Sequence, residues 1–131
     1  MAKHFYPAIF NPEQTGEYSV FFPDLPGCNT QGATLEQAYE MAFDALGLYL
    51  EGIPECNYPA KSNPKDIAIG SDQFVAIVEF DNLSYQRKHN TKSVKKTLTI
   101  PGWLNALAEE NHINFSSILQ DALKEHLQVR D

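Results

Sequence analysis

The last third of the chain joins one β-strand pattern to two helical patterns, and this combination limits the possible folds more than any other feature. Apolar residues alternate with lysine and threonine over 94–100, and Pro101, which suits the first turn of a helix, ends the alternation. Apolar stripes at helical spacing follow over 102–110 and 115–129. A unit of about 40 residues without a disulfide or metal buries too little apolar surface to offset its chain entropy. The tail is therefore not expected to fold alone.

Pairing of two copies would remove this deficit. The strand over 94–100 has no partner within its own unit, but it can pair with the same strand of a second chain. Val94, Leu98 and Ile100 would then form the inner face of a two-stranded ribbon, with four helices packed beneath it. The sequence therefore predicts a homodimer held together by its C-terminal ribbon and helices.

The outer face of this ribbon would carry Lys95, Thr97 and Thr99. Such side chains can donate hydrogen bonds to base edges or accept them, and threonine methyl groups can contact thymine methyls. A two-stranded ribbon also fits the major groove of DNA. We therefore predict that these three residues contact DNA bases.

Contacts to DNA phosphates are expected from the start of the second tail helix. Asn114 can cap that helix, whose first N–H groups are free to bind a phosphate. Together with Asn114 we assign Ser116 and Lys92 to phosphate contacts.

The first 82 residues show a different pattern, with strands and one helix in the order β-β-β-α-β. Thr34 is a suitable N-cap, and Gln37, three residues later, completes a capping box. Apolar spacings of three and four predict the buried face of the helix, formed by Leu35, Ala38, Ala42, Ala45, Leu46 and Tyr49. We expect strands over 3–10, 17–22, 28–31 and 73–80 and a helix over 35–50.

Two boundaries follow from these patterns. The segment 73–80 is almost entirely apolar, so we expect it in the interior of the sheet. The segment 83–93 is polar and basic, and we interpret it as a linker. The fold class is thus α+β, with a first domain over 1–82, a linker over 83–93 and a strand-helix-helix domain over 94–131.

The net charge of −7 hides an asymmetry between the two parts of the chain. Residues 1–85 carry twelve acidic residues against three lysines, which gives −9, whereas residues 86–131 carry seven basic residues against five acidic ones, which gives +2. The two parts therefore suit different charged partners. Charge alone leaves a second interpretation open, in which the first part is acidic for solubility and the basic segment is a solvated linker.

Both parts resemble known families. The tail is similar to the ribbon-helix-helix repressors of the Arc/MetJ/CopG type, through "TLTIP" followed by "WLNALAEE" and "INFSSILQDAL". The first 82 residues resemble the HicB antitoxins, through "YPAIF", "YSVFFPDLPGCNTQGATLEQA" and "LYLEG". Two positions depart from the family pattern, since Ala33 stands where Asp is frequent and His112 where Gly is frequent. Asn111 or His112 would then adopt the left-handed conformation between the tail helices.

The resemblance implies a cytoplasmic antitoxin of a type II toxin–antitoxin pair. Its first domain would have a partial ribonuclease H-like fold and would cover the active site of a small HicA-type toxin that cleaves mRNA. Its tail would bind operator DNA as a dimer and repress the shared operon, and pairing of the first domains as well would give a tetramer. An acidic domain complements the basic surface that an RNA-cleaving toxin needs.

The toxin is expected to contact an exposed strand edge or the loop "FPDLPGCN" of the first domain. Within and beside this loop we assign the contact to Phe22, Asp24, Leu25, Cys28 and Asn29.

Enzymatic activity is not expected. A ribonuclease H-like nuclease needs several carboxylates around a metal ion, but the strand over 5–10 has no acidic residue, and Asp24, Glu79 and Asp81 are scattered. The four histidines show no metal-ligand spacing, and the two cysteines are isolated. No stretch of about 18 apolar residues predicts a membrane span, and the N-terminus lacks the long apolar region of a signal peptide. We therefore expect a binding protein without metal, cofactor or membrane segment.

One alternative function remains at this point. The chain would be a stand-alone ribbon-helix-helix regulator whose acidic domain senses a small ligand. The neighbouring gene separates the two hypotheses, because a HicA-type toxin would be encoded there as a short frame with a Gly-rich start and a central His.

Overall fold

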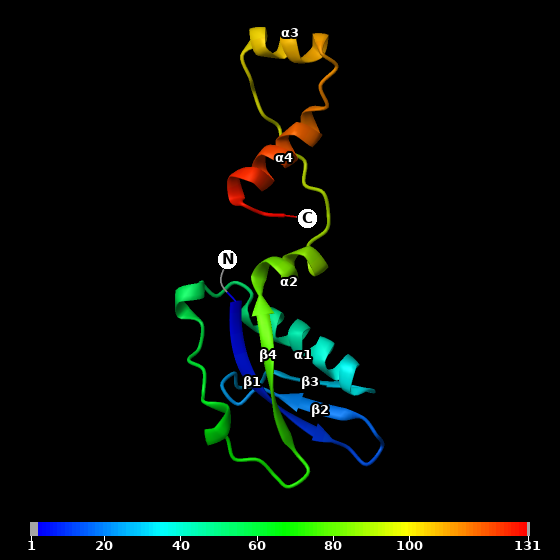
Figure 1. The fold of residues 1–131 in the computed structure, drawn as a ribbon, viewed down its shortest axis with the longest axis vertical. Coiled ribbons are helices and arrows are strands. Elements are labelled where there is room, and N and C mark those ends of the chain that lie inside the picture. The colour runs from blue at the N-terminus through cyan, green and yellow to red at the C-terminus, as the bar shows by residue number, and fades with distance from the viewer. Residues whose placement is uncertain (1–2, 131) are drawn as a thin grey trace. The chain divides into compact units, whose positions relative to one another are not determined.

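The computed structural model describes residues 3–130 and divides the chain into two compact units, Met1–Lys92 and Ser93–Asp131. The fold is α+β (Figure 1). The first unit contains four strands, β1 (Lys3–Pro12), β2 (Tyr18–Phe21), β3 (Asn29–Gly32) and β4 (Phe74–Asp81), two helices, α1 (Leu35–Leu50) and α2 (Asn82–His89), and two short 3-10 turns, Glu55–Asn57 and Pro64–Asp66. The second unit contains α3 (Gly102–Glu110) and α4 (Phe115–Leu127). The predicted order β-β-β-α-β is confirmed for the first unit.

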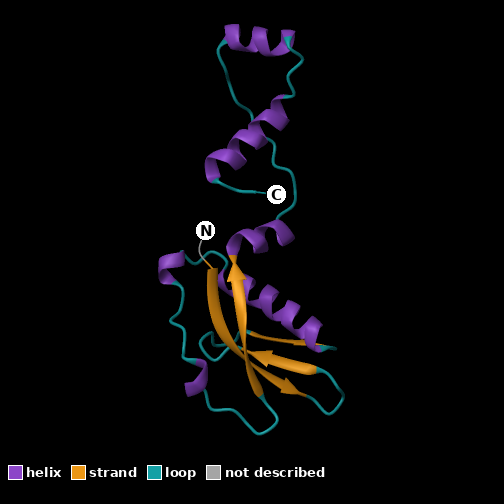
Figure 2. Cartoon of the chain, in the orientation of Figure 1, coloured by secondary structure: helices purple, strands orange, loops and turns teal. Residues whose placement is uncertain are grey.

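The four strands form one antiparallel sheet in the order β3-β2-β1-β4, with α1 packed on one face (Figure 2). Strand β1 is central, and Tyr6, Ala8 and Phe10 point from it into the core against α1. Proline lacks the N–H that a ladder needs, yet Pro7 is tolerated in this central strand. An N–H at position 7 would point to the side of β2. Since β2 pairs with β1 only from Ile9 onward, the proline costs no bond between these strands.

Helix α1 begins at the predicted N-cap Thr34, but the Gln37 side chain bonds the residue before the cap instead of the cap itself. The Thr34 hydroxyl accepts a hydrogen bond from the Gln37 backbone N–H at 3.1 Å, and the Gln37 side chain accepts one from the Ala33 N–H at 2.7 Å. Small residues let the helix approach the sheet closely, since a Cβ at Gly32 would collide with the Ala38 backbone. Of the six residues predicted to be buried, Ala38, Ala42 and Leu46 are buried, Ala45 and Tyr49 are partly buried and Leu35 is exposed.

Strand β4 is an edge strand, so its predicted interior position is wrong. Val78 and Phe80 point into the core, but Ile77, on the opposite face, is 41% exposed. The Tyr39 hydroxyl of α1 reaches the free edge, donating to the Ile77 carbonyl and accepting from the Glu79 N–H, both at 3.3 Å. A side chain from α1 thus takes part of the role of a neighbouring strand, which explains how so apolar a segment occupies an edge.

The expected linker is corrected over 83–89, where the chain forms most of helix α2. Asp81 caps this helix by accepting a hydrogen bond from the Leu83 N–H at 3.0 Å. Tyr85 is buried against Gly47 of α1, where a Cβ would collide with the tyrosine ring. Lys88 and His89 both bond the Asp44 carboxylate, at 2.9 and 3.0 Å. One aromatic anchor and one ion-pair cluster therefore fix a segment whose composition suggested only a linker.

The second unit has two helices and no buried residue within the described range 93–130. Over 90–101 the single chain forms no strand, as is physically expected of a strand without a partner. His112 takes the left-handed conformation with φ 54°, which confirms one of the two residues predicted for it. Asn114 caps α4 by accepting a hydrogen bond from the Ser117 N–H at 3.0 Å, as predicted.

Candidate functional site

The lysine and threonine residues predicted to contact DNA bases are exposed. Lys95, Thr97 and Thr99 alternate with Leu98 and Ile100, which are 63% and 45% exposed in the single chain. Both sides of the segment are therefore open to solvent. The distinction between an inner and an outer face stays a prediction that depends on a paired ribbon.

Next to this segment the second unit has an apolar hollow of about 540 Å³. It is lined by Lys96, Leu98, Ile100, Asn105, Phe115, Ser116, Ile118, Leu119 and Ala122. Ser116 is thus at the rim of an apolar surface, while Lys92 is exposed just before the unit begins. The Asn114 side chain is occupied by the cap, so a phosphate at this helix end would meet backbone N–H groups.

Three of the residues assigned to toxin contact have their side chains buried beneath the loop. Phe22, Leu25 and Cys28 are 3%, 0% and 5% exposed, so their side chains are buried in the single chain, and their contact with the toxin stays a prediction. The Cys28 thiol donates to the Ala45 carbonyl of α1 at 3.6 Å, and burial raises its pKa to about 11. Of the other two assigned residues, Asn29 is exposed, whereas the Asp24 carboxylate is hydrogen-bonded to Ser62.

Asp24 holds a distant loop in place. Its carboxylate accepts hydrogen bonds from the Ser62 N–H at 2.8 Å and from the Ser62 hydroxyl at 2.5 Å. These bonds fix the 54–66 loop to the turn between β2 and β3. Asp24 therefore has a structural role, which its position in the loop motif did not reveal.

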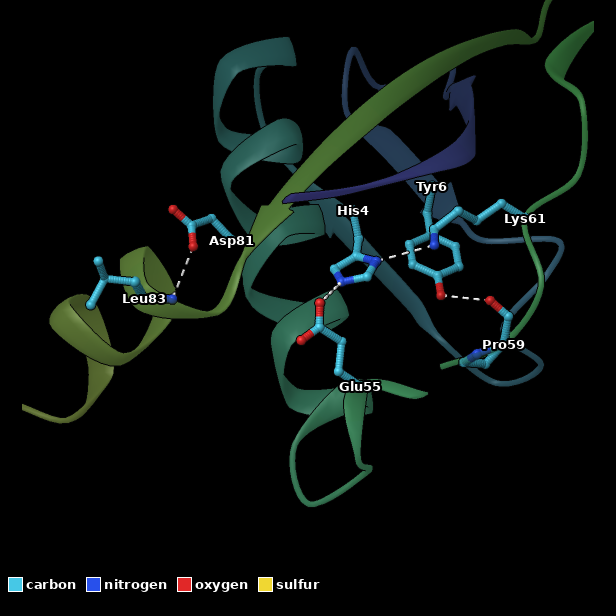
Figure 3. A network of polar contacts seen from close by, with 7 residues as sticks. All are labelled: His4, Tyr6, Glu55, Pro59, Lys61, Asp81 and Leu83. Carbon is cyan, nitrogen blue, oxygen red and sulfur yellow. Dashed lines mark hydrogen bonds and ion pairs between the residues drawn. The ribbon is translucent and has the colours of Figure 1, made fainter. Parts of the chain in front are cut away.

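The same 54–66 loop is bound to β1 by a polar network around His4 (Figure 3). The Lys61 ammonium lies 3.1 Å from His4 Nδ1, and His4 Nε2 lies 2.8 Å from the Glu55 carboxylate. Since an ammonium only donates, Nδ1 accepts and Nε2–H donates to Glu55. Tyr6 donates to the Pro59 carbonyl at 2.7 Å, and burial raises the pKa of this tyrosine. No local sequence signal predicted this network, because its partners are more than fifty residues apart.

A polar cavity of about 390 Å³ lies where α1 ends, close to this network. It is lined by His4, Gly47, Leu50, Glu51, Gly52, Ile53, Glu55, Tyr58, Phe80, Asn82, Tyr85 and Gln86. Within residues 3–130, no group of three or more His, Cys, Asp or Glu side chains could hold a metal ion. In the same range, no helix is long and apolar enough to cross a bilayer.

The described chain thus has two parts, a closed acidic unit and a tail of two helices with an open apolar surface. The model of the HicB-like antitoxin family of bacterial toxin–antitoxin systems matches residues 6–123. The chain therefore belongs to this family and is an antitoxin of a toxin–antitoxin system.

Two curated relatives and one solved structure agree with this assignment. Antitoxin HicB 2 of Photorhabdus laumondii is 26% identical over 95% of this chain and 94% of its own length. Antitoxin HicB 1 of the same bacterium is 54% identical, but the match covers 31% of this chain and 26% of that protein. A chain of a toxin–antitoxin complex from Streptococcus pneumoniae is 27% identical with a TM-score of 0.58, over 95% of this chain and 99% of that one.

Proposed function

We propose that the chain binds and blocks a HicA-type toxin that cleaves mRNA and, as a dimer, binds operator DNA to repress its own operon. One contrast supports this division best. The first unit has a closed core and an acidic surface, whereas the tail exposes most of its apolar side chains beside a lysine and threonine segment.

Toxin binding is assigned to the first unit. Residues 1–92 carry twelve acidic residues against six basic ones, a net charge of −6. An RNA-cleaving protein needs a basic surface to bind its substrate, and an acidic partner both complements that surface and speeds association. The similar chain from Streptococcus pneumoniae comes from a toxin–antitoxin complex, which is consistent with this role.

DNA binding is assigned to the tail, in a ribbon-helix-helix arrangement. Two copies would pair their 94–100 segments and cover the apolar hollow beside Leu98 and Leu119. The ribbon would then present Lys95, Thr97 and Thr99 to the major groove. Asn114, Ser116 and Lys92 would contact phosphates. Pairing of the first units as well would give a tetramer, and the site of action would be the cytoplasm.

Co-purification tests both halves of the proposal. The protein encoded by the adjacent gene, expressed with this chain, should co-purify with it and lose its RNA-cleaving activity. A fragment covering residues 1–92, which includes α2, should bind the same protein without binding the promoter. Absence of any complex between the full chain and the adjacent gene product would overturn the toxin half.

The polar cavity at the end of α1 favours the alternative of a ligand-sensing regulator. Its volume of about 390 Å³ suits a small polar molecule, and it lies between α1 and α2. A small ligand bound there would change promoter binding, which a titration of the promoter complex with candidate metabolites would test.

A further inference from the structure

The two edge strands of the sheet, β3 and β4, differ in whether a side chain bonds their outward backbone groups. On β4, the Tyr39 hydroxyl bonds the outward carbonyl of Ile77 and the outward N–H of Glu79. A hydroxyl that satisfies one donor and one acceptor at the centre of a short strand prevents another strand from pairing there. The β4 edge is therefore blocked by a side chain of α1.

At the β3 edge, no side chain among residues 3–130 makes an equivalent pair of bonds. The Phe22 N–H bonds the Cys28 carbonyl at 3.2 Å, which sets the alternation of the antiparallel pair β2–β3. By this alternation Thr30 and Gly32 direct their backbone groups toward β2, and Asn29 and Gln31 direct theirs away from the sheet. The side chains of Asn29 and Gln31 are exposed as well. One edge of the sheet thus offers backbone donors and acceptors to an added strand.

Side chains suited to a partner lie along this open edge. A hollow of about 210 Å³ is lined by Glu17, Gln31, Gly32, Ala33, Gln37 and Met41, and one of about 190 Å³ by Gly27, Cys28, Asn29, Ala45, Leu48 and Tyr49. Each hollow therefore joins one outward residue of β3 to helix α1. Met41 and Leu48 of α1 are 41% and 67% exposed, although both are apolar.

We propose that the β3 edge accepts an extended segment of a basic protein, which pairs with the backbone of Asn29 and Gln31. Apolar side chains of that segment would lie on Met41 and Leu48, and a lysine or arginine would reach Glu17. This inference rests on the proposed function, in which the basic protein is the toxin. A second copy of the chain is the weaker occupant, because two units of net charge −6 repel each other.

The matched variants are Gln31→Pro and Val75→Pro in the full-length chain. Each removes an outward N–H, one from the open edge and one from the blocked edge, without removing a bond between strands of the sheet. The probe is the purified product of the adjacent gene, measured by titration calorimetry. Gln31→Pro should weaken binding by about tenfold or more, and Val75→Pro should leave it within about threefold of the parent.

Amide hydrogen exchange of the parent chain tests the same edge without a substitution. The N–H groups of Asn29 and Gln31 should become protected when the adjacent gene product binds, whereas those of Val75 and Ile77 should exchange as before. This measurement decides the question even where Gln31→Pro does not fold. Unchanged exchange at β3 in a formed complex overturns the inference.

Failure of this inference differs from failure of the proposed function. If the parent does not bind the adjacent gene product at all, the proposed function fails. If the parent binds it and folded Gln31→Pro binds equally well, the function stands and the β3 assignment is wrong. If Gln31→Pro lowers only the oligomeric state of the chain, the edge is occupied by a second copy instead, which also overturns the assignment.

Discussion

The two units of the chain differ in how far their apolar side chains are buried. In the first unit, side chains such as Tyr6, Phe10 and Leu46 are completely buried between a sheet and a helix. In the second, Val94, Trp103 and every large apolar residue of α4 remain at least 36% exposed. Burial of apolar surface is the main driving force of folding, so we expect the first unit to be stable as a monomer and the second to need a partner. The contrast supports the proposal that the tail is completed by a second copy of the chain.

The largest effect is expected from a charge on the apolar stripe of α4, which should disrupt the dimer of the tail. Leu123→Asp would place an unpaired carboxylate in the proposed dimer interface, at a cost of about 3–5 kcal/mol. Sedimentation equilibrium should show monomers with an unfolded tail and an intact first unit. Gln120→Asp, on the same helix but outside the stripe, is the control and should leave the dimer unchanged. A folded monomeric parent would refute the assembly model directly.

A cavity in the first unit should destabilise that unit and leave the dimer of the tail unchanged. Leu46 is completely buried, and Leu46→Ala should lower the free energy of unfolding of this unit by about 2–5 kcal/mol. Thermal melting followed by circular dichroism would measure the loss. The dimer affinity of the tail should not change, and a parallel loss of both would show that the units fold as one.

Substitutions in the lysine and threonine segment should affect DNA binding without affecting stability. Thr97→Ala and Thr99→Ala should each cost about 1–3 kcal/mol per lost base contact, with the loss counted in both copies of a dimer. Lys95→Ala should also flatten the salt dependence, since fewer counterions are released. Fluorescence anisotropy on the promoter at two salt concentrations measures both effects.

Leu98→Ala is the matched contrast for this segment, because it should lower the melting temperature as well as DNA affinity. Parent-like operator binding by both threonine variants, together with an unchanged stability of Leu98→Ala, would show that the faces of the ribbon are assigned backwards.

Glycine substitutions in the two units should have smaller and opposite effects on stability. Gly47→Ala should destabilise the first unit by about 1–3 kcal/mol and displace α2, because the added methyl group would collide with the Tyr85 ring. Gly102→Ala, in the open second unit, meets no atom within 4 Å and should be neutral or slightly stabilising. Tyrosine fluorescence and melting curves would follow both. Equal stability of the two variants would contradict the packing of α2 on α1.

The smallest expected effect is the pH dependence of the α1–α2 contact. Burial opposes ionisation of Asp44, but hydrogen bonds from Lys88 and His89 outweigh it and lower the pKa below the ordinary 3.8. A lowered carboxyl pKa stabilises the fold above the unfolded-state value, and this contribution is lost as the pH falls through the folded-state value.

Asp44→Asn tests this contact. Because the ion pair is partly exposed, the variant should cost about 0.2–1 kcal/mol at pH 7 and nothing once the parent carboxyl is protonated. Melting curves from pH 2 to 7 would give both values. A cost that is the same at every pH would show that charge is not the cause.

Local patterns were sufficient where the cause is local. The N-cap at Thr34, the span of α1, the cap at Asn114 and the left-handed residue at His112 all depend on neighbours within a few positions. The burial of Phe22, Leu25 and Cys28 was not predicted, because a specific sequence motif does not reveal which of its side chains point inward. The DNA contacts and the toxin surface stay predictions, since both depend on partners.

Periodicity and charge are properties of adjacent residues, so the order of the elements, the acidity of the first unit and the apolar stripes of the tail could be predicted from the residues alone. Three features became evident only in the folded chain: β4 lies at an edge bonded by Tyr39, 82–89 forms a helix packed on α1, and Asp24 and His4 hold the 54–66 loop. The physical reason is separation along the chain. These partners lie between 38 and 57 residues apart, so their contacts exist only after the sheet and helix have brought them together.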